Sequence, residues 1–549
     1  TVALVIEATG SDGAGGTVTT DVKVTAVGNT GIAGIGDNTT TLLQLTSDDL
    51  ASFGDGDPVP SWPDASGYGN DADQVASAEQ PLLESDATAS LNDAPVLRFD
   101  GTDDELEIAD AVSLNAGDDG SGEPYLQRAL SFVVRTGSNV SDRQVIYEEG
   151  GGTRGFNAYV FGGDLYVAAW NNADDALVGG GTDPTTPWEN DTAGDGFVFV
   201  QNGVSTNTAY VVSLFYDYAT GTVEMWVNGE SVGSASGAGR QYDHGGDIAI
   251  GANTDGTFYE TGQSGAGPSE FFTGDVAAAS FTDASLNETQ RTLLHNALGA
   301  TYAIGLSTNA TDVYAGDETG NGDYDLGVFG IGQTSVADRH TSASFDGLQF
   351  DLSSGLDDGD YLVAGHRSDE NGVTSDDVSG VTGLDVRMDR TWYVDQANDS
   401  GGSITIDVTI DLSDAGLSGI AGTASDYVLL ERGADATSGT NWNSIATGAS
   451  TANTDQITFT GVTLTDGNEI TLGTTDQVAS PLGGAQIVLR GTAGNEGSVD
   501  DLNPNGGDAG FVLLGPPESG GTYAGLASDT DPQLIEFDLP GPMIYSYNA

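Results

Sequence analysis

The stretch TAYVVSLFYDYATGTVEMWVNGE, residues 208–230, contains two runs of alternating apolar residues separated by a short turn. Apolar side chains at every second position lie on one face of a β-strand. The turn is formed by Ala219, Thr220 and Gly221, and the alternation resumes with Val223 and Val227. A glycine in a short turn between two such runs is typical of a hairpin. The stretch therefore predicts two antiparallel strands.

Similar short apolar runs, separated by glycine-rich turns, recur along the whole chain, which contains 81 glycines. Examples are PVLRFDG, LSFVVRTG, RQVIYEEGG, GDLYVAAW and GDIAIGA before residue 280, and YDLGVFGIG, SITIDVTIDLS and DYVLLERG after residue 310. This pattern is typical of antiparallel β-sandwiches. The sequence therefore predicts an all-β protein with several sandwich or jelly-roll domains.

One segment departs from this pattern and predicts a short amphipathic helix, SLNETQRTLLHNALGATYAIG, residues 285–305. Ser285 and Glu288 have the spacing of a capping box, in which each side chain satisfies a free backbone N–H. Leu294, Leu298 and Tyr302 then fall on one helical face, together with an alanine at 297. We expect the helix to end before Gly305 and to close a domain. The predicted divisions are a β segment at 1–40, a jelly roll at 41–306, a second sandwich at 307–477 and a β segment at 478–549.

The composition excludes several classes of protein. The chain carries 83 acidic residues against 14 lysines and arginines, a net charge of -69, so it lacks the cations that nucleic acids or anionic membranes require. Its 38% hydrophobic content argues against disorder and favours a folded protein with an acidic surface adapted to high salt. It contains no cysteine, and no apolar run is long enough for a membrane helix. Because it begins at Thr1 without a methionine, we expect an exported, processed chain.

Several motifs in order between residues 41 and 306 resemble a known family. They are LLQLTSDDLASFGDGDPVPSWPDASGYGNDADQ, PVLRFDGTDDELEI, LSFVVRTG, VEMWVNGE, FFTGDVAAASF and the LNETQRTLLHNALGATYAI helix. This half of the chain resembles a laminin-G-like module of the concanavalin A-like lectin and glucanase superfamily. The resemblance implies a two-sheet jelly roll of about 12–14 strands. The following segment is similar, more weakly, to β domains found after such modules in surface proteins of marine and salt-loving bacteria.

Calcium is the one cofactor that the sequence suggests, at two acidic loops. In the first, WPDASGYGND, Asp64 and Asp71 offer the oxygen ligands that calcium prefers, and laminin-G-like modules often hold calcium near the sandwich rim. Asp100 and Asp275, which adjoin neighbouring strands, are weaker candidates. The alternative is that this stretch is a structural turn in which Pro63 and the two glycines set the backbone and the aspartates are solvated.

The second acidic loop is DETGNGDYDLG, residues 317–327, in which Asp317 is the first candidate ligand. Asn321, Asp323 and Asp325 are spaced two apart, as at the start of an EF-hand loop. The loop departs from that pattern because Leu326 occupies the position of the expected glycine and no glutamate falls at the twelfth position. Chance acidic clusters are also expected in a chain with this much aspartate.

Candidate sugar-binding aromatics are Trp170, Trp188 and Tyr242, since sugar faces stack on exposed rings. Trp226 alternates with valine and methionine in a strand, so it is better explained as covering a sheet face. No catalytic residues are predicted. The glucanase signature of paired carboxylates is not matched by EFDLPG at 536–541, which has a proline and a glycine where the motif should continue, and the four histidines lie in no motif.

The chain ends suggest a third role, self-assembly. The N-terminal strand TVALVIEA is almost entirely apolar, and it could complete a sheet of a neighbouring subunit by β-augmentation. The residues that would carry polymerisation are Thr1, Val2, Leu4, Val5 and Ile6. Pairing of residues 1–8 within their own chain would remove this hypothesis.

Taken as a whole, the sequence predicts an extracellular or cell-surface, non-enzymatic structural or adhesive protein from a high-salt environment. Its partners are expected to be further copies of itself, in a filament or appendage, or extracellular glycans. The alternative is a monomeric, calcium-dependent, lectin-like adhesin. The two hypotheses differ in an observable way: a filament subunit forms large assemblies, whereas a lectin is retained on a polysaccharide and released by a chelator. The sequence does not identify the glycan.

Overall fold

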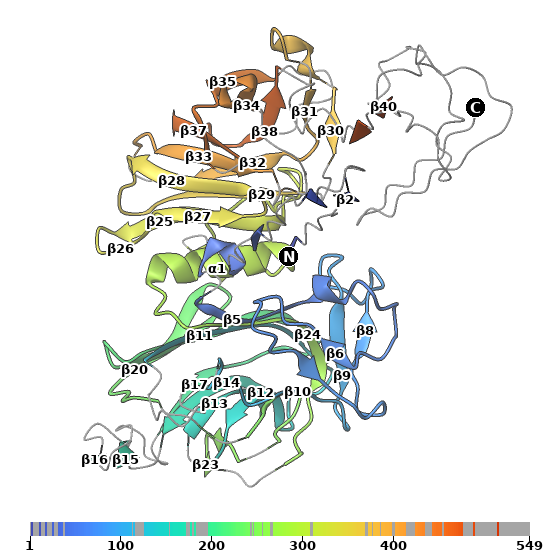
Figure 1. Cartoon of the computed structure of the whole chain (residues 1–549). Coiled ribbons are helices and arrows are strands. Elements are labelled where there is room, and N and C mark those ends of the chain that lie inside the picture. The colour runs from blue at the N-terminus through green and yellow to red at the C-terminus, as the bar shows by residue number, and fades with distance from the viewer. Residues whose placement is uncertain are drawn as a thin grey trace, which may run out of the picture.

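The structure is a computed structural model, and it describes most of residues 31–475 (Figure 1). Within that range the undescribed residues are 37–38, 112, 116–125, 153, 172–175, 178–180, 183–195, 242–243, 245, 255, 264–266, 308–310, 368–371, 376, 385, 398–400, 413–414, 416–422, 434–441 and 453–454. Outside it, the described residues are the six pairs 2–3, 10–11, 17–18, 25–26, 487–488 and 513–514. The architecture is all-β with one α-helix in the described part of the chain, as the sequence predicts.

The first sandwich consists of two eight-stranded antiparallel sheets. The helix-side sheet, next to helix α1, has the order β20 (Glu230–Ser236), β19 (Thr222–Val227), β18 (Ala209–Asp217), β11 (Gln127–Thr136), β24 (Thr273–Thr282), β9 (Val96–Asp100) and β8 (Leu82–Glu84), with β5 (Thr41–Thr46) also paired to β24. The distal sheet has the order β17 (Gly196–Gln201), β14 (Asp164–Asn171), β13 (Arg154–Phe161), β12 (Gln144–Gly150), β21 (Ile248–Ile250), β10 (Leu106–Ile108), β7 (Ala72–Asp73) and β6 (Ser61–Trp62). The predicted hairpin is confirmed as β18 and β19.

The helix-side sheet is buried on both faces, and this explains why its strands are apolar at nearly every position. In β11, Phe132 and Val134 face the distal sheet and belong to the main core of the first sandwich. Ala129 and Val133 alternate with them and pack toward α1 in a separate apolar cluster. A strand buried on both faces gives a continuous apolar run instead of alternation.

The second sandwich, residues 326–474, has one sheet of nine strands and one of five. The nine-stranded sheet contains β26 (Asp338–His340), β25 (Leu326–Ser335), β29 (Asp360–His366), β32 (Trp392–Ala397), β38 (Asn468–Thr474), β31 (Val386–Met388) and β30 (Val373–Thr374), with β34 (Tyr427–Gly433) beside β38 and β35 (Asn443–Thr447) beside β34. The five-stranded sheet has the order β27 (Ser342–Phe345), β28 (Leu348–Ser354), β33 (Thr405–Asp411), β37 (Gln456–Val462) and β36 (Ser450–Ala452). The two sheets enclose their own apolar core.

Helix α1 (Glu288–Thr301) begins two residues later than the sequence predicts. The N-cap is Asn287, not Ser285, and the capping box uses Gln290 instead of Glu288: Asn287 Oδ1 accepts from Gln290 N at 2.9 Å, and Gln290 Oε1 accepts from Asn287 N at 3.1 Å. Asparagine is as good an N-cap as serine, so the local signal allowed both. A tertiary contact favours the later start, because Asp338 of the second sandwich accepts the free N–H groups of Glu288 and Thr289.

Helix α1 lies between the two sandwiches (Figure 1). Its buried leucines share one apolar cluster with side chains of the helix-side sheet, such as Phe215 and Trp226, and with side chains of the nine-stranded sheet, such as Val328 and Tyr393. The predicted apolar face is buried, but so are Leu293 and His295, which flank that face on its two sides. The helix therefore closes the first sandwich, as predicted, and also packs against the second, so that both sandwiches share it as one layer.

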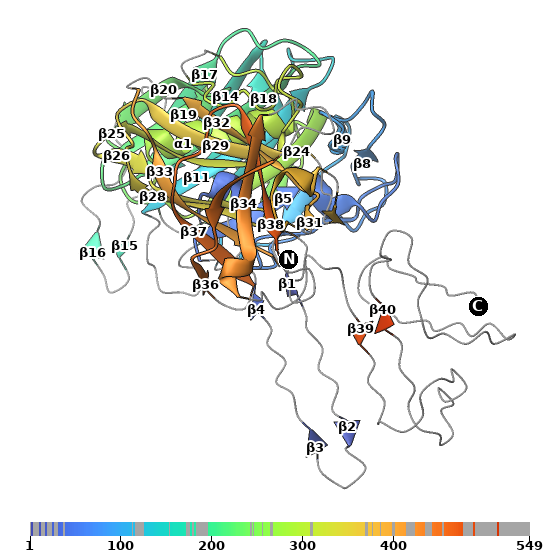
Figure 2. The same cartoon turned by 90° about the horizontal axis from the view of Figure 1, so that it is seen from above.

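The remaining elements are short. They are the paired strands β1 (Val2–Ala3) with β4 (Thr25–Ala26), β2 (Gly10–Ser11) with β3 (Thr17–Val18), β15 (Ala176–Leu177) with β16 (Gly181–Thr182), β22 (Phe258–Tyr259) with β23 (Gly262–Gln263) and β39 (Ile487–Val488) with β40 (Leu513–Leu514), and the 3₁₀ turns η1 (Ile32–Gly34), η2 (Ser47–Leu50), η3 (Val378–Gly380) and η4 (Ala424–Asp426). Figure 2 shows the β2–β3 and β39–β40 pairs outside the body formed by the two sandwiches. Among the residues described, no helix has the length and hydropathy needed to span a bilayer.

Candidate metal centre and other predicted sites

The turn between β9 and β10 brings three carboxylates together. β9 ends at Asp100, and Gly101 then adopts a positive φ of 78°, where an added Cβ would collide with Thr273. Two side-chain contacts fix the turn: Thr102 N donates to Asp100 Oδ1 at 2.6 Å, and Asp100 N donates to Asp104 Oδ2 at 2.8 Å. As a result, carboxylate oxygens of Asp100, Asp103 and Asp104 lie within 4.8 Å of one another.

This spacing suits a divalent cation that prefers oxygen ligands. Calcium binds oxygens at about 2.4 Å, so two ligands on opposite sides of the ion lie about 4.8 Å apart. Among the residues that the structure describes, this is the one group of at least three acidic or histidine side chains close enough to share an ion. Asp100 is exposed, Asp103 is half-buried and Asp104 is buried, so the group is open to solvent on one side.

The carboxylates of this turn repel one another. Burial, followed by the charges of Asp100 and Asp103, raises the pKa of Asp104 to about 6. The adjacent Glu105 is also affected, since burial and the charges of Glu107 and Glu79 raise its pKa to about 7. A bound cation would offset this repulsion, because it stabilises the ionised form of each ligand.

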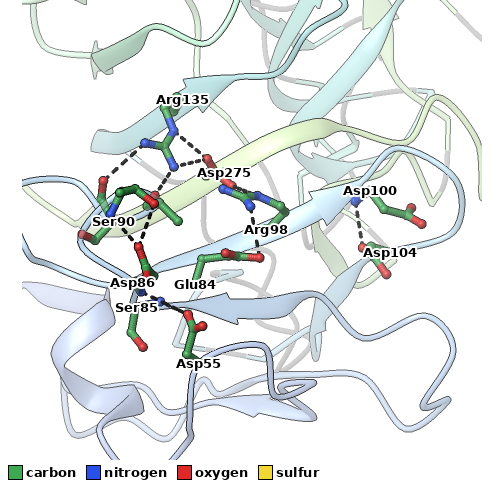
Figure 3. A network of polar contacts seen from close by, with 12 residues as sticks. Asp55, Glu84, Ser85, Asp86, Ser90, Arg98, Asp100, Asp104, Arg135 and Asp275 are labelled. Atoms are coloured by element: carbon green, nitrogen blue, oxygen red, sulfur yellow. Dashed lines mark hydrogen bonds and ion pairs between the residues drawn. The ribbon is translucent and has the colours of Figure 1, made fainter.

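Asp275, which the sequence predicts as a further ligand, is part of a different network (Figure 3). Its two oxygens face two arginines: Arg98 Nε lies 2.8 Å from Oδ1, and Arg135 Nε lies 2.6 Å from Oδ2. Arg98 also pairs with Glu84 at 3.0 Å, and Arg135 donates to the carbonyl of Ser90. A carboxylate held by two guanidinium groups already has its charge balanced, so this arrangement does not favour a metal ion at Asp275.

The stretch WPDASGYGND forms the β6–β7 connection, and Asp64 organises it. Its carboxylate accepts four hydrogen bonds, from Gln44 N, Ser66 N, Ser66 Oγ and Asn70 N, at 2.5–3.0 Å. Asp71 Oδ1 accepts from Asp64 N at 2.8 Å. Trp62 is fully buried and donates to Thr46 O. These contacts favour the structural alternative for this loop, because the Asp64 carboxylate already accepts four hydrogen bonds, about as many as its oxygens can take.

The structure does not bring the second predicted calcium loop together. Asn321 donates to Ala315 O at 2.7 Å within its own loop, Asp323 is exposed, and Asp325 accepts from Asn92 of the first sandwich. Asp317 is more notable, since burial and the charges of Asp312, Glu318 and Asp325 raise its pKa to about 7. Calcium at this loop stays a prediction without a convergent set of ligands.

The aromatic residues predicted to bind sugar are not presented to solvent where they are described. Trp170 is fully buried: Nε1 donates to Gly151 O at 2.9 Å, and its ring stacks on Phe258 at 6.0 Å between centroids. The expectation of an exposed platform at Trp170 is therefore wrong, because the segment carrying β22 covers that face of the distal sheet. Trp226 covers a sheet face, as expected, beneath α1. Trp188 and Tyr242 lie outside the described residues.

A buried hydrogen bond between a histidine and a serine runs in the wrong direction for catalysis. His295 Nε2 lies 3.0 Å from Ser213 Oγ, but His295 Nδ1 accepts the N–H of Gly229 at 2.9 Å. Burial lowers the pKa of His295 to about 3, so the ring is neutral and its hydrogen is on Nε2. His295 therefore donates to Ser213 and does not act as its base. Both residues are fully buried, which also closes them to a substrate.

The predicted polymerisation strand is paired internally where it is described. Val2 and Ala3 form β1, which pairs antiparallel with Thr25 and Ala26 of the same chain. By the criterion stated above, this pairing argues against an exchange of Val2 between subunits. Thr1, Leu4, Val5 and Ile6 lie outside the described residues.

Comparisons with known proteins give no family assignment. No protein-family model matches the chain, and no curated protein matches it. The solved structures with some similarity include the Ruminococcus gnavus IT-sialidase CBM40 bound to α2,3-sialyllactose, at 15% identity over 30% of this chain and 78% of that one, with a TM-score of 0.21. The botulinum neurotoxin serotype D binding domain is 10% identical over 67% of this chain and 73% of that one, with a TM-score of 0.30. The serotype G binding domain is 9% identical over 78% and 81%, with a TM-score of 0.28. Similarities this low do not assign a function.

Two residues of the candidate metal centre, Asp103 and Asp104, are absent from the sequence-based predictions. The signal was present in FDGTDDELEI, where three aspartates surround one glycine over five positions. It was missed because acidic clusters are common in this chain. Only the positive φ at Gly101 and the return contact from Asp104 to Asp100 distinguish this one.

Proposed function

We propose that the protein is a non-enzymatic, extracellular adhesive protein whose first sandwich binds its ligand through calcium at the β9–β10 turn. The observation that carries the proposal is the convergence of Asp100, Asp103 and Asp104 within 4.8 Å on a turn open to solvent. These residues fit calcium, since they supply three hard oxygen donors on a short, fixed turn. The laminin-G-like resemblance of residues 41–306 agrees with a binding role.

A glycan is the ligand class that fits this site best. Calcium takes six to eight oxygen ligands, and three aspartates leave positions that sugar hydroxyls can occupy. A nucleic acid does not fit, since the chain has 83 acidic residues against 14 basic ones. Self-assembly through the N-terminal strand has less support, because β1 pairs with β4 of its own chain.

We expect retention of the full chain on immobilised polysaccharides in calcium and its release by EDTA. The variant Asp103→Asn should abolish retention, because it removes one ligand charge while leaving both turn-forming hydrogen bonds intact. Retention on a glycan array, measured with and without EDTA, checks this expectation.

Asp93→Asn is the matched control for that experiment. Asp93 is exposed, has a positive φ of 62° that asparagine tolerates, and causes the same change in net charge. It should bind like the wild-type protein. Retention that EDTA does not affect, or that Asp103→Asn leaves unchanged, would sink the proposal. Large assemblies of the native protein that dissolve on loss of residues 1–26 would favour the filament hypothesis instead.

Calcium affinity should also depend on pH. The pKa of Asp104 is about 6, and calcium binds the ionised carboxylate, so protons compete with the ion below that pH. We expect the affinity to be nearly constant above pH 7 and to fall by about tenfold per unit below pH 6. Calorimetric titrations at several pH values measure this. A flat profile between pH 5 and pH 7 would exclude Asp104 as a ligand.

A further inference from the structure

The contact between α1 and the helix-side sheet contains a row of serines. Ser131 of β11 lies directly opposite Ser213 of β18 on one side and Ser280 of β24 on the other. Each serine interrupts an otherwise apolar run, and each is buried. Buried hydroxyl groups require hydrogen-bond partners, since leaving one unpaired is costly. Each hydroxyl group of this row is therefore expected to have a hydrogen-bond partner.

The hydrogen bond between His295 and Ser213 has a defined direction. His295 Nδ1 accepts from Gly229 N, so the neutral ring carries its hydrogen on Nε2 and donates it to Ser213 Oγ. Ser213 Oγ lies 2.8 Å from Ser131 Oγ, and either hydroxyl can be the donor of this hydrogen bond. Where Ser213 donates to Ser131, the hydroxyl hydrogen of Ser131 needs an acceptor beyond Ser213.

A small cavity lies at this end of the row. Its volume is about 10 Å³, and the polar residues among those that line it are Thr41, Ser131, Ser280 and Thr282. Thr41 is buried, and its Oγ1 has no hydrogen-bond partner among the described residues. The cavity is thus lined by Thr41, whose hydroxyl has no partner among the described residues, and by Ser131, whose hydroxyl can take a partner besides Ser213.

We infer that this cavity is a binding site for one structural water molecule. The water accepts the hydrogen of Ser131, bonds to Thr41 Oγ1 and completes a chain that runs from Gly229 N through His295, Ser213 and Ser131. A volume of about 10 Å³ holds one water, and a buried water needs two to four polar partners; four of the lining residues carry a hydroxyl group. The cavity is too small for any larger ligand. The water joins β5 to β11 within the sheet that α1 covers.

Two direct measurements test the inference. A high-resolution crystal structure should show one ordered water within hydrogen-bonding distance of both Thr41 Oγ1 and Ser131 Oγ. Long-range ¹H–¹⁵N NMR of ¹⁵N-histidine-labelled full-length protein should show His295 as the Nε2–H tautomer, with the signal assigned through its loss in His295→Gln. A dry cavity in a structure that resolves other internal waters would overturn the inference, as would the Nδ1–H tautomer.

A stability measurement distinguishes a bound water from an unpaired hydroxyl, because the two predict opposite shifts in the midpoint of thermal unfolding. Thr41→Val keeps the side-chain shape and removes only the hydroxyl. If the water is bound, the variant should lower the midpoint of thermal unfolding, because the water loses a partner. If the hydroxyl is unpaired, the midpoint should rise, and the inference fails. Thr471→Val is the control, since its buried hydroxyl donates to Arg390 O at 2.7 Å and its loss must lower the midpoint.

Discussion

Transfer of the protein from about 1 M to about 0.01 M NaCl is expected to cause a large loss of stability, because the Debye length grows from about 3 Å to about 30 Å over this range. The folded chain then experiences the full repulsion of a net charge of -69. Few cations can offset it at the surface. Arg128, Arg387, Arg390 and Arg432 are all buried, and the single lysine is residue 23.

The midpoint of thermal unfolding, followed by circular dichroism over this range of NaCl, measures the effect. A titration with sucrose is the control, since sucrose strengthens burial without screening charge. Salt should raise the midpoint steeply below about 0.5 M, where screening changes most, and sucrose should act weakly and evenly. A midpoint that does not depend on salt would contradict adaptation of this surface to high ionic strength.

The second large effect is expected from Leu293→Ala in helix α1. Leu293 is 1% exposed, and it belongs to the apolar cluster that both sandwiches share. Truncating a buried leucine costs about 2–5 kcal/mol of unfolding free energy, including the cavity left behind. Because the cluster includes Phe215 of one sandwich and Tyr393 of the other, the substitution should lower the stability of both sandwiches.

Denaturant unfolding with hydrogen exchange resolved by mass spectrometry distinguishes this account from one of independent domains. Leu429→Ala is the comparison, since Leu429 is fully buried in the core of the second sandwich alone. We expect peptides from β11 and from β29 to unfold together in the wild-type protein, and both variants to shift that common transition. Separate transitions, of which Leu293→Ala moves only one, would show that α1 does not join the two sandwiches.

The sequence was sufficient to predict the fold class, because antiparallel strands leave a local signal. The alternation in residues 208–230 predicts β18 and β19, and the turn at Gly221 falls between them. The same kind of signal does not reveal which face of a sheet is covered. Ser131, Ser213 and Ser280 each look like a polar interruption in sequence, and only the cross-strand register places them in one row beneath α1.

The sites were harder to predict for a physical reason: their properties depend on tertiary contacts. The sequence predicts Trp170 as an exposed aromatic, yet Phe258, 88 positions later in the chain, covers it. The sequence predicts Asp275 as a ligand because it is an acidic residue beside a strand, but Arg98 and Arg135 converge on it from β9 and β11. It predicts Asp100 on equal grounds, and the neighbouring Asp103 and Asp104 complete the group.

The central claim is that calcium binds at the β9–β10 turn, and calorimetric titration of the full-length protein with calcium tests it most directly. The titration should be made in about 1 M NaCl at pH 7.5, so that screening suppresses weak binding to other carboxylates. The account predicts saturable binding that Asp103→Asn weakens by roughly tenfold to a hundredfold and that Asp93→Asn leaves unchanged. Absence of saturable binding, or equal affinity in the wild-type protein and Asp103→Asn, would contradict it.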